Sequence, residues 1–232
     1  IVLFISGFAY LCIYLKRFQH AMTKVRVRFA PSPTGPLHIG GVRTALYNYL
    51  FAKKNNGTFI LRIEDTDQVR FVEGAEEYIM ESLSWCGIKV DEGIREGGDY
   101  SPYRQSDRKS IYKQYADILV EKGDAYYAFD TTDQLGKLRE EAEKEGNTFI
   151  YNASVREKLS NSISLSEQEW KEKLKTGEAY VIRYRMPQNT EIHVDDLVRG
   201  NIVVNTSTLD DKVLFKSDGM PTYHLANIVD DH

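Results

Sequence analysis

The sequence is poor in cysteine, and this excludes several classes of protein. Only Cys12 and Cys86 occur in 232 residues, and they form no Cys-x-x-Cys pair. Two isolated thiols build neither a disulfide framework nor the four-ligand site that structural zinc requires. We therefore expect no structural zinc and no metal ligands, and the low cysteine content favours a reducing compartment, the cytoplasm.

The sequence also has no excess of positive charge. It contains 30 Lys and Arg against 34 Asp and Glu, for a formal net charge of -4. A protein that coats nucleic acid by charge alone would be basic, so any nucleic-acid binding here must use a local basic face. With 42% hydrophobic and 28% charged residues, the chain is neither a disordered tail nor a collagen-like repeat nor a multi-span membrane protein.

No hydrophobic run is long enough to span a membrane. The apolar stretch 1–15 is shorter than the roughly 18 to 20 residues that a spanning helix needs. Lys16 and Arg17 follow this stretch, whereas a secretory signal places its positive charge first. A hydrophobic anchor is one interpretation. We favour the other, in which residues 1–22 are a leader outside the functional protein, Met22 is the true start, and no membrane is bound.

A strand, a helix and a second strand follow one another near the N-terminus. Residues 25–30 alternate apolar and charged, and 58–63 form a second apolar run. Between them the spacing becomes helical, with one face formed by Ile39, Val42, Leu46, Tyr49 and Leu50. This order predicts a βαβ unit, and hence a parallel strand pair with a right-handed crossover.

The rest of the chain mixes helices and strands irregularly. Helices are expected at 72–86, 106–122, 131–144 and 166–175, and strands at 125–129, 180–186, 202–204 and 213–216. Pro221 opens a last helix, and because the chain stops within it we expect the chain to be cut there. We predict an α/β fold with a Rossmann-like parallel sheet: a first half at 23–105, an inserted α/β module at 106–222, and the start of the second half at 223–232.

The strongest local feature is the loop Ala-Pro-Ser-Pro-Thr-Gly-Pro-Leu-His-Ile-Gly-Gly at 30–41, between the first strand and its helix. Ligands of open parallel sheets bind at the carboxyl ends of the strands, and helix N-termini offer N–H groups to phosphates. His38 can donate to a phosphate oxygen, and Gly40 and Gly41 leave room for a nucleotide. An ordinary Pro/Gly turn with a surface histidine is the simpler alternative for any shorter piece of this string.

Arg28 and Glu64 stand at the ends of the two neighbouring strands. A guanidinium at this rim can hold a carboxylate in a bidentate fork, and a carboxylate can take an ammonium group. Tyr223 and Asn227 are four residues apart on the last predicted helix, so they face the same way. Taken singly, Arg28 and Glu64 are better explained as surface charges. At adjacent strand ends they favour a ligand pocket.

The loop resembles the HIGH-type motif of class I aminoacyl-tRNA synthetases, and its flanks are similar to the bacterial type of glutamyl-tRNA synthetase. Three further blocks, at 62–67, 102–106 and 216–227, come in the family's order. The resemblance covers 23–232. It implies a cytoplasmic, monomeric glutamate–tRNA ligase that activates L-glutamate with ATP and Mg²⁺, forms glutamyl adenylate, and transfers the glutamyl group to the 3′ end of tRNA(Glu) in translation.

The resemblance also assigns roles to residues. The catalytic residues it implies are His38, Gly40 and Gly41, and those that bind ATP are Pro31, Ser32, Thr34, His38, Gly40 and Gly41. The L-glutamate pocket takes Arg28, Ala30, Ser32, Glu64, Tyr223 and Asn227. Contacts with tRNA are expected from Asp67, Arg70, Arg104 and Ser106. The insert would hold the acceptor end, with phosphate contacts from Arg104, Lys109, Lys113, Arg183, Arg185 and Arg199, although each is equally well explained as a solvated surface charge.

Two departures from the family pattern qualify these roles. The fourth position of the motif is Gly41 rather than histidine, as in bacterial glutamyl enzymes. A second, lysine-rich ATP loop would lie beyond His232, so we expect these residues alone not to complete aminoacylation. Three alternatives stay open: a short relative that glutamylates a modified tRNA base, a ligase of small metabolites, and a non-catalytic RNA-binding fragment.

Overall fold

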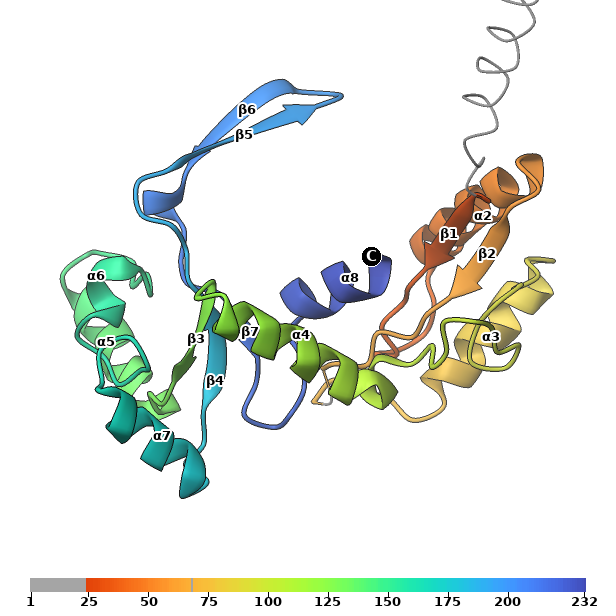
Figure 1. Ribbon diagram of the computed structural model, residues 1–232. Coiled ribbons are helices and arrows are strands. Elements are labelled where there is room, and N and C mark those ends of the chain that lie inside the picture. The colour runs from red at the N-terminus through yellow and green to blue at the C-terminus, as the bar shows by residue number, and fades with distance from the viewer. Residues whose placement is uncertain (1–23, 68) are drawn as a thin grey trace, which may run out of the picture. The chain divides into compact units, whose positions relative to one another are not determined.

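The structure is a computed structural model, and it describes residues 24–67 and 69–232 (Figure 1). The leader expected at 1–22 lies outside the described residues. The chain divides into two compact units, one that ends at Asp107 and one formed by Arg108–His232. In the described part of the chain, no helix has both the length and the apolar character needed to cross a membrane.

The first unit contains the predicted βαβ arrangement. Strand β1 (Arg26–Phe29) is followed by α2 (Ile39–Lys54), β2 (Thr58–Leu61) and α3 (Ala75–Trp85). Strands β1 and β2 pair in parallel, with Arg26 opposite Thr58 and Phe29 opposite Leu61. The chain returns from α2 into β2 through Gly57, where an added Cβ would lie 2.3 Å from the carbonyl oxygen of Val25. Glycine is therefore required where the two strands begin to run together.

The core of the first unit lies between the strands and the two helices. Phe29, Phe59, Leu61 and Ile63 are buried, as are the helix residues Ala45, Ala52, Ile79 and Leu83. Only part of the face predicted for α2 is buried, since Tyr49 packs against this core but other members of the face do not. Ile39 is 82% exposed and Leu50 is 53% exposed, whereas Ala45 and Ala52 are fully buried. Small side chains on the buried side let the helix backbone approach the sheet closely, which a search for large apolar residues overlooks.

The second unit has an antiparallel sheet flanked by helices. A 3₁₀ helix, η1 (Gln105–Arg108), leads into α4 (Lys109–Glu121), so the helix predicted at 106–122 begins with a 3₁₀ turn. The remaining elements are β3 (Ala125–Ala128), α5 (Thr132–Lys144), α6 (Ala153–Arg156), α7 (Glu167–Lys175), β4 (Val181–Tyr184), β5 (Glu191–Asp196), β6 (Gly200–Asn205), η2 (Thr206–Thr208), β7 (Val213–Phe215) and α8 (Tyr223–Asp231). The sheet has the order β3-β4-β7.

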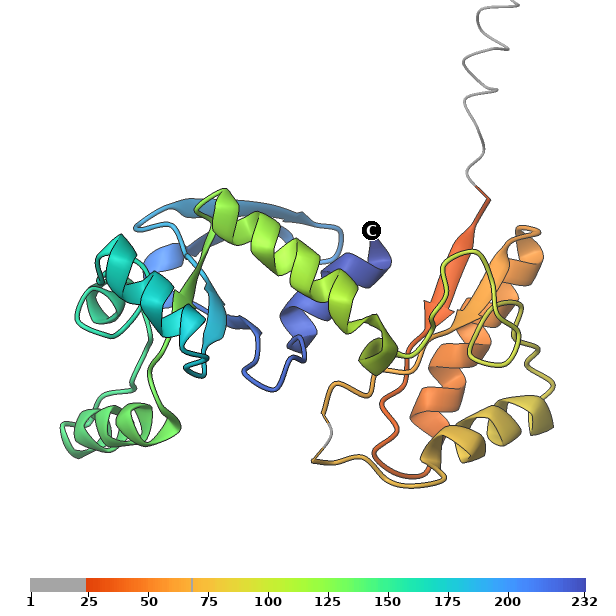
Figure 2. The same cartoon turned by 60° about the horizontal axis from the view of Figure 1, so that its bottom comes forward.

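Two hydrophobic clusters cover the two faces of this sheet. Ala125 belongs to the cluster with α4 and α8, whose members include Tyr112, Ala116, Ile182, Phe215, Leu225 and Ala226. Tyr126 and Ala128 belong to the other cluster, with Leu135 of α5 and Tyr151. Because neighbouring strand residues point to opposite faces, α4 and α8 pack on one face and α5 on the other, an arrangement that can be followed in Figure 2.

A hairpin of β5 and β6 extends from the sheet (Figure 1). Strand β5 was not predicted from the sequence, and β6 was predicted only over 202–204. Strand β5 carries Ile192 and Val194, which are 41% and 47% exposed, between charged neighbours. Residues 191–195 alternate polar and apolar, which is a strand pattern, but the run is short and its apolar side chains are exposed; pairing with β6 forms the strand.

Candidate functional site

The loop after β1 is held beside the segment after β2 by backbone hydrogen bonds. The Arg62 N–H donates to the Phe29 carbonyl over 3.1 Å, and the Glu64 N–H donates to the Pro31 carbonyl over 3.0 Å. The N–H of Val72 donates to the Pro33 carbonyl over 3.0 Å. The parallel pairing therefore continues past the strands in an irregular form. It fixes the 30–34 segment next to Glu64, at the carboxyl ends of both strands.

His38 is the N-cap residue of α2. Its Nδ1 accepts a hydrogen bond from the Gly40 N–H over 3.1 Å. Since Nδ1 is the acceptor, a neutral ring carries its proton on Nε2, and this nitrogen can donate to a ligand. An added Cβ at Gly40 would lie 2.7 Å from Cε1 of His38. Gly40 is thus needed for the ring to cap the helix, apart from any contact with a nucleotide.

A pocket of about 420 Å³ opens beside this capped helix. Its lining includes five of the six residues expected to bind ATP, namely Pro31, Ser32, Thr34, His38 and Gly41. Phe29 and Ile79, which are 7% and 1% exposed, contribute apolar walls from the core. The N-terminus of α2 supplies the positive end of the helix dipole, which favours an anion. The pocket therefore combines a phosphate-binding element with an apolar surface.

Glu64 is held in place by Arg62, a residue that the sequence analysis did not single out. Arg62 Nη2 lies 2.9 Å from Glu64 Oε1, and their side chains are only 7% and 12% exposed. The buried guanidinium orients the carboxylate at the end of β2. Arg28, opposite Ile60 in the parallel register, is half-buried on the neighbouring strand, and Ala30 and Ser32 follow it in the loop. Four of the six residues expected to bind glutamate thus belong to the first unit.

The other two residues expected to bind glutamate belong to α8 in the second unit. The Asn227 Nδ2 donates to Tyr223 Oη over 3.3 Å, so the two side chains lie on one face of the helix, as predicted. Tyr223 is 58% exposed. Their use as glutamate contacts stays a prediction.

The residues expected to contact tRNA are engaged within the first unit. Arg70 Nε lies 2.6 Å from Asp67 Oδ2, and this hydrogen bond lowers the pKa of Asp67. Arg104 makes two hydrogen bonds to Glu76, of 3.0 and 2.7 Å, and a third to Asp107 of 3.2 Å. These ion pairs hold the loop 102–107 against α3, a role that the sequence did not reveal.

Asp65 is a second residue that the sequence analysis missed as a positioning group. Its side chain accepts a hydrogen bond from the Ser106 N–H over 2.8 Å, and the residue is 4% exposed. The acidic residue after β2 therefore fixes the start of η1. Because its partner is 41 residues away in sequence, only the three-dimensional structure reveals the pairing.

One of the basic residues proposed for phosphate contacts in the insert is buried. Arg183 is 7% exposed, its Nη1 donates to the Asp211 carbonyl over 2.9 Å, and its guanidinium lies 3.8 Å from the centre of the Tyr151 ring. The expectation of a surface role for Arg183 is wrong, because the strand position turns the side chain into the core. Lys113 pairs with Asp117 along α4.

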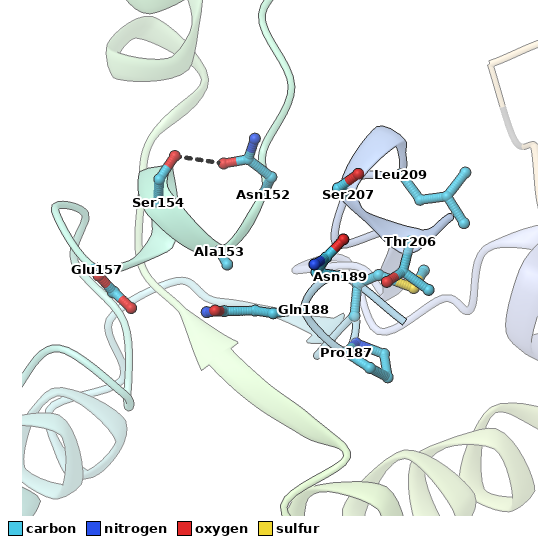
Figure 3. Close-up of a pocket in the computed structure, with 11 residues that line it drawn as sticks. Asn152, Ala153, Ser154, Glu157, Pro187, Gln188, Asn189, Thr206, Ser207 and Leu209 are labelled. Atoms are coloured by element: carbon cyan, nitrogen blue, oxygen red, sulfur yellow. Dashed lines mark hydrogen bonds between the residues drawn. The ribbon is translucent and has the colours of Figure 1, made fainter. Parts of the chain in front are cut away.

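A second pocket, of about 320 Å³, lies at the base of the β5–β6 hairpin (Figure 3). Amide and hydroxyl side chains dominate its lining, which includes Asn152, Ser154, Gln188, Asn189, Thr206 and Ser207. Ser154 Oγ donates to Asn152 Oδ1 over 2.8 Å. None of the lining residues is basic, and none was predicted as a site residue. Elsewhere, the described residues contain no group of three or more His, Cys, Asp or Glu that could hold a metal ion.

The fold and the loop that contains His38 agree with the result of a comparison against protein families. Residues 24–232 match the family of class I tRNA synthetases for E and Q, catalytic domain. The match covers well over half of the chain, and the chain belongs to this family. The parallel βαβ unit and the mixed α/β fold agree with the prediction from the sequence.

Particular relatives are close in sequence. The chain is 64% identical over 210 residues to the glutamate–tRNA ligase of Christiangramia forsetii, and 64% identical over 209 residues to that of Flavobacterium psychrophilum. In both cases the match covers 90% of this chain and 42% of the relative. The chain thus spans less than half the length of these relatives.

Solved structures of the same class superpose well. A crystal structure of a glutamate tRNA ligase from Elizabethkingia meningosepticum, in complex with its amino acid, has a TM-score of 0.86 at 59% identity. The glutamate–tRNA synthetase of Elizabethkingia anophelis gives a TM-score of 0.85 at 59% identity. Each match covers 90% of this chain and 42% of the other chain.

Proposed function

We propose that residues 24–232 form the catalytic part of a glutamate–tRNA ligase. The observation that carries the proposal is the His38 loop, which caps α2, lines a pocket of about 420 Å³ and is hydrogen-bonded to the segment that holds Glu64. Family membership and the names of the relatives support the same conclusion. The domain limits follow the sequence analysis: 23–105 and 223–232 as catalytic parts, 106–222 as the insert.

In the first step a carboxylate oxygen of L-glutamate attacks the α-phosphorus of ATP. A new P–O bond forms in line with the bond to pyrophosphate, which leaves with the electron pair of the broken bond. ATP enters as its magnesium complex, as a substrate. His38 Nε2–H and the N-terminus of α2 stabilise the charge on the phosphate oxygens, and the Pro-rich loop positions the nucleotide. The other residues that we propose to contact ATP are Pro31, Ser32, Thr34, Gly40 and Gly41.

Glutamate recognition follows from its charges. Arg28 holds a carboxylate in a bidentate fork, and Glu64, oriented by Arg62, takes the α-ammonium. Ala30 and Ser32 add neutral contacts beside them, and Tyr223 and Asn227 are the further residues that we propose to contact glutamate. This set selects an amino acid with two carboxylates over its amide, because an amide leaves part of the guanidinium unsatisfied.

In the second step a hydroxyl of the terminal adenosine of tRNA(Glu) attacks the glutamyl carbonyl carbon. An ester bond forms, and AMP leaves as the mixed anhydride bond breaks. Asp67, Arg70, Arg104 and Ser106 contribute to the contact with tRNA, and the insert holds the acceptor end. We place the enzyme in the cytoplasm as a monomer.

The test is glutamate-dependent exchange between ATP and labelled pyrophosphate in the presence of tRNA. It is run on the 232-residue chain and on the full natural polypeptide that carries this sequence, with L-glutamate, L-glutamine and L-aspartate in parallel. We expect exchange with L-glutamate in the full polypeptide. Exchange that proceeds equally with all three amino acids, or with none, contradicts the proposal.

A matched tRNA control separates the proposal from transfer to a modified base. The acceptor is tRNA(Glu), either intact or lacking only its 3′-terminal adenosine. Glutamyl transfer to the intact tRNA alone supports the ligase, and transfer to both supports the modifying enzyme.

A further inference from the structure

A carboxylate is buried near the C-terminal end of α8. The Asp230 side chain is 1% exposed, and it accepts hydrogen bonds from Arg108 Nε over 2.8 Å and from Tyr112 Oη over 2.9 Å. All three residues belong to the second unit. Arg108 is the N-cap residue of α4, and Tyr112 is on the first turns of that helix. Asp230 therefore joins the end of α8 to the beginning of α4.

Burial of the Asp230 carboxylate has a desolvation cost. A buried ion pair offsets that cost without large net stabilisation. The N-terminus of α4 supplies the compensating field, since its dipole favours an anion. The carboxylate is therefore stable only when α8 is placed so that Asp230 meets Arg108, Tyr112 and the N-terminus of α4. A displaced α8 would lose these contacts.

The apolar contacts of α8 fix its position less narrowly. Leu225 and Ala226 are the buried residues of the helix, and they pack against α4 and the sheet. Contacts of this kind are non-directional and tolerate small rotations. The hydrogen bonds from Arg108 and Tyr112 are directional, so they define the rotation of α8 about its axis.

That rotation sets where Tyr223 and Asn227 point. Asp230 follows Asn227 by three residues and Tyr223 by seven, which correspond to about one and two helical turns. The three residues therefore lie along the same side of α8. The rotation that satisfies Asp230 also determines the direction of the Tyr223–Asn227 pair.

We propose that Asp230, held by Arg108 and Tyr112, is a positioning residue for glutamate recognition through Asn227 and Tyr223. This inference rests on the proposed function, in which those two residues contact L-glutamate. Burial, followed by the charge of Asp230, raises the pKa of Tyr112 well above its usual range, so the hydroxyl keeps its proton and remains a donor.

The experiment measures the KM for L-glutamate and the KM for ATP separately in pyrophosphate exchange by the full natural polypeptide. Asp230→Asn keeps the shape of the side chain but removes its charge. We expect the KM for L-glutamate to rise about tenfold and the KM for ATP to change less than about twofold, the pattern of a lost charge-assisted contact that acts on one substrate. Asp231→Asn is the matched control, because this neighbour is exposed. It should leave both constants within about twofold.

A double-mutant cycle shows whether Asp230 acts through Asn227. If it does, Asp230→Asn adds less than about twofold to the KM of Asn227→Ala. Additive effects, equal rises in both KM values, or an unchanged KM for L-glutamate overturn the inference. If Asp230→Asn fails to fold, Tyr112→Phe removes one donor and should raise the KM for L-glutamate about threefold, and no rise contradicts the inference. Absence of glutamate-dependent exchange in the unmutated protein contradicts the proposed function instead.

Discussion

Arg26 and Arg28 lie two residues apart on β1, so their side chains leave the same side of the strand. Arg26 is paired with Glu92 through two hydrogen bonds of 2.6 and 2.8 Å, and its guanidinium lies 4.6 Å from the centre of the Tyr100 ring. Arg28 stands at the end of the strand, beside the loop that lines the pocket. Substitution of each arginine in turn therefore compares a structural arginine, Arg26, with Arg28, which we propose to bind the substrate.

Arg28→Ala should weaken glutamate recognition by roughly 1.5 to 3 kcal/mol, since a charge-assisted contact to the substrate carboxylate is lost. The measurement is kcat/KM for L-glutamate in pyrophosphate exchange by the full natural polypeptide. Arg26→Ala is the control, and it should reduce stability while leaving the glutamate dependence unchanged. An unchanged glutamate dependence in Arg28→Ala would exclude Arg28 from the pocket.

The ionisation of Glu92 makes the stability of the first unit depend on pH. The hydrogen bond from Arg26, opposed by burial and reinforced by the Tyr103 hydroxyl at 2.6 Å, lowers the pKa of Glu92. A lowered folded-state pKa stabilises the protein above the unfolded pKa of about 4.3, and this contribution is lost as the pH falls through the folded value.

We therefore expect Glu92→Gln to cost about 1 kcal/mol near pH 7 and progressively less below pH 4, where the unmutated protein also loses the charge. Urea unfolding at a series of pH values from 3 to 7 checks this. Glu96→Gln, an exposed-loop neighbour, serves as the control. A constant difference between Glu92→Gln and the unmutated protein across that range would show that the ion pair is not the source of the effect.

At the scale of elements, one side chain of helix α2 has both a structural role and a proposed catalytic role. His38 caps the helix with Nδ1 and presents Nε2 to the pocket. His38→Ala should lose about 1 kcal/mol of stability from the cap and about 10² to 10³ in kcat from the missing donor. His38→Asn separates the roles, because asparagine is a good N-cap but has no Nε2.

We expect His38→Asn to recover most of the stability and little of the exchange activity. Thermal unfolding and pyrophosphate exchange on the same preparations check both parts. Full recovery of activity in His38→Asn would mean that the residue only caps the helix.

In the second unit, Asp211 links several elements around β3 and β4. The residue is fully buried, and its carboxylate accepts hydrogen bonds from Tyr126, Arg156 and the Met186 N–H, at 2.6, 2.8 and 3.0 Å. Asp211→Ala leaves the Arg156 guanidinium, 4% exposed, without this partner.

The expected loss for Asp211→Ala is about 3 to 5 kcal/mol in the free energy of unfolding. Asp210→Ala, which removes a surface pair with Lys212, should cost less than about 1 kcal/mol. Urea unfolding of both variants measures the difference. Equal losses would show that Asp211 adds nothing beyond an exposed charge.

The predictable elements are those whose pattern is local. The βαβ unit follows from alternation, helical spacing and a Pro/Gly loop, all within one stretch of chain, and the capping boxes of α5 and α7 lie at the N-caps Thr131 and Ser166. The buried face of α2 was predictable only in part: Tyr49 packs against the core as predicted, but the fully buried residues of the helix are two alanines. Strand β5 alternates polar and apolar residues over 191–195, but this run is short, and pairing with β6 forms the strand.

At the scale of the whole molecule, the functional residues also divide into those with a local sequence pattern and those that depend on distant partners. His38, Gly40 and the loop around them could be predicted because the motif is contiguous. The support of Glu64 by Arg62 required the direction of each side chain, and the Asp65–Ser106 and Asp230–Arg108 contacts join residues 41 and 122 positions apart. No periodicity in one sequence carries such pairings, since each depends on the folded path between the partners.

The last prediction concerns the residues before Met22. The family match begins at residue 24, and the earliest described contacts are the hydrogen bond from the Thr58 N–H to the Val25 carbonyl and the packing of Val27 against the core. Every described core residue therefore remains in a chain that starts at Met22. We expect the free energy of unfolding of that chain to lie within about 0.5 kcal/mol of the value for the 232-residue chain, because no described core residue is removed. Urea unfolding and ATP binding of the two chains are the measurements, and a loss of several kcal/mol or of ATP binding on removing residues 1–21 would make those residues part of the functional fold.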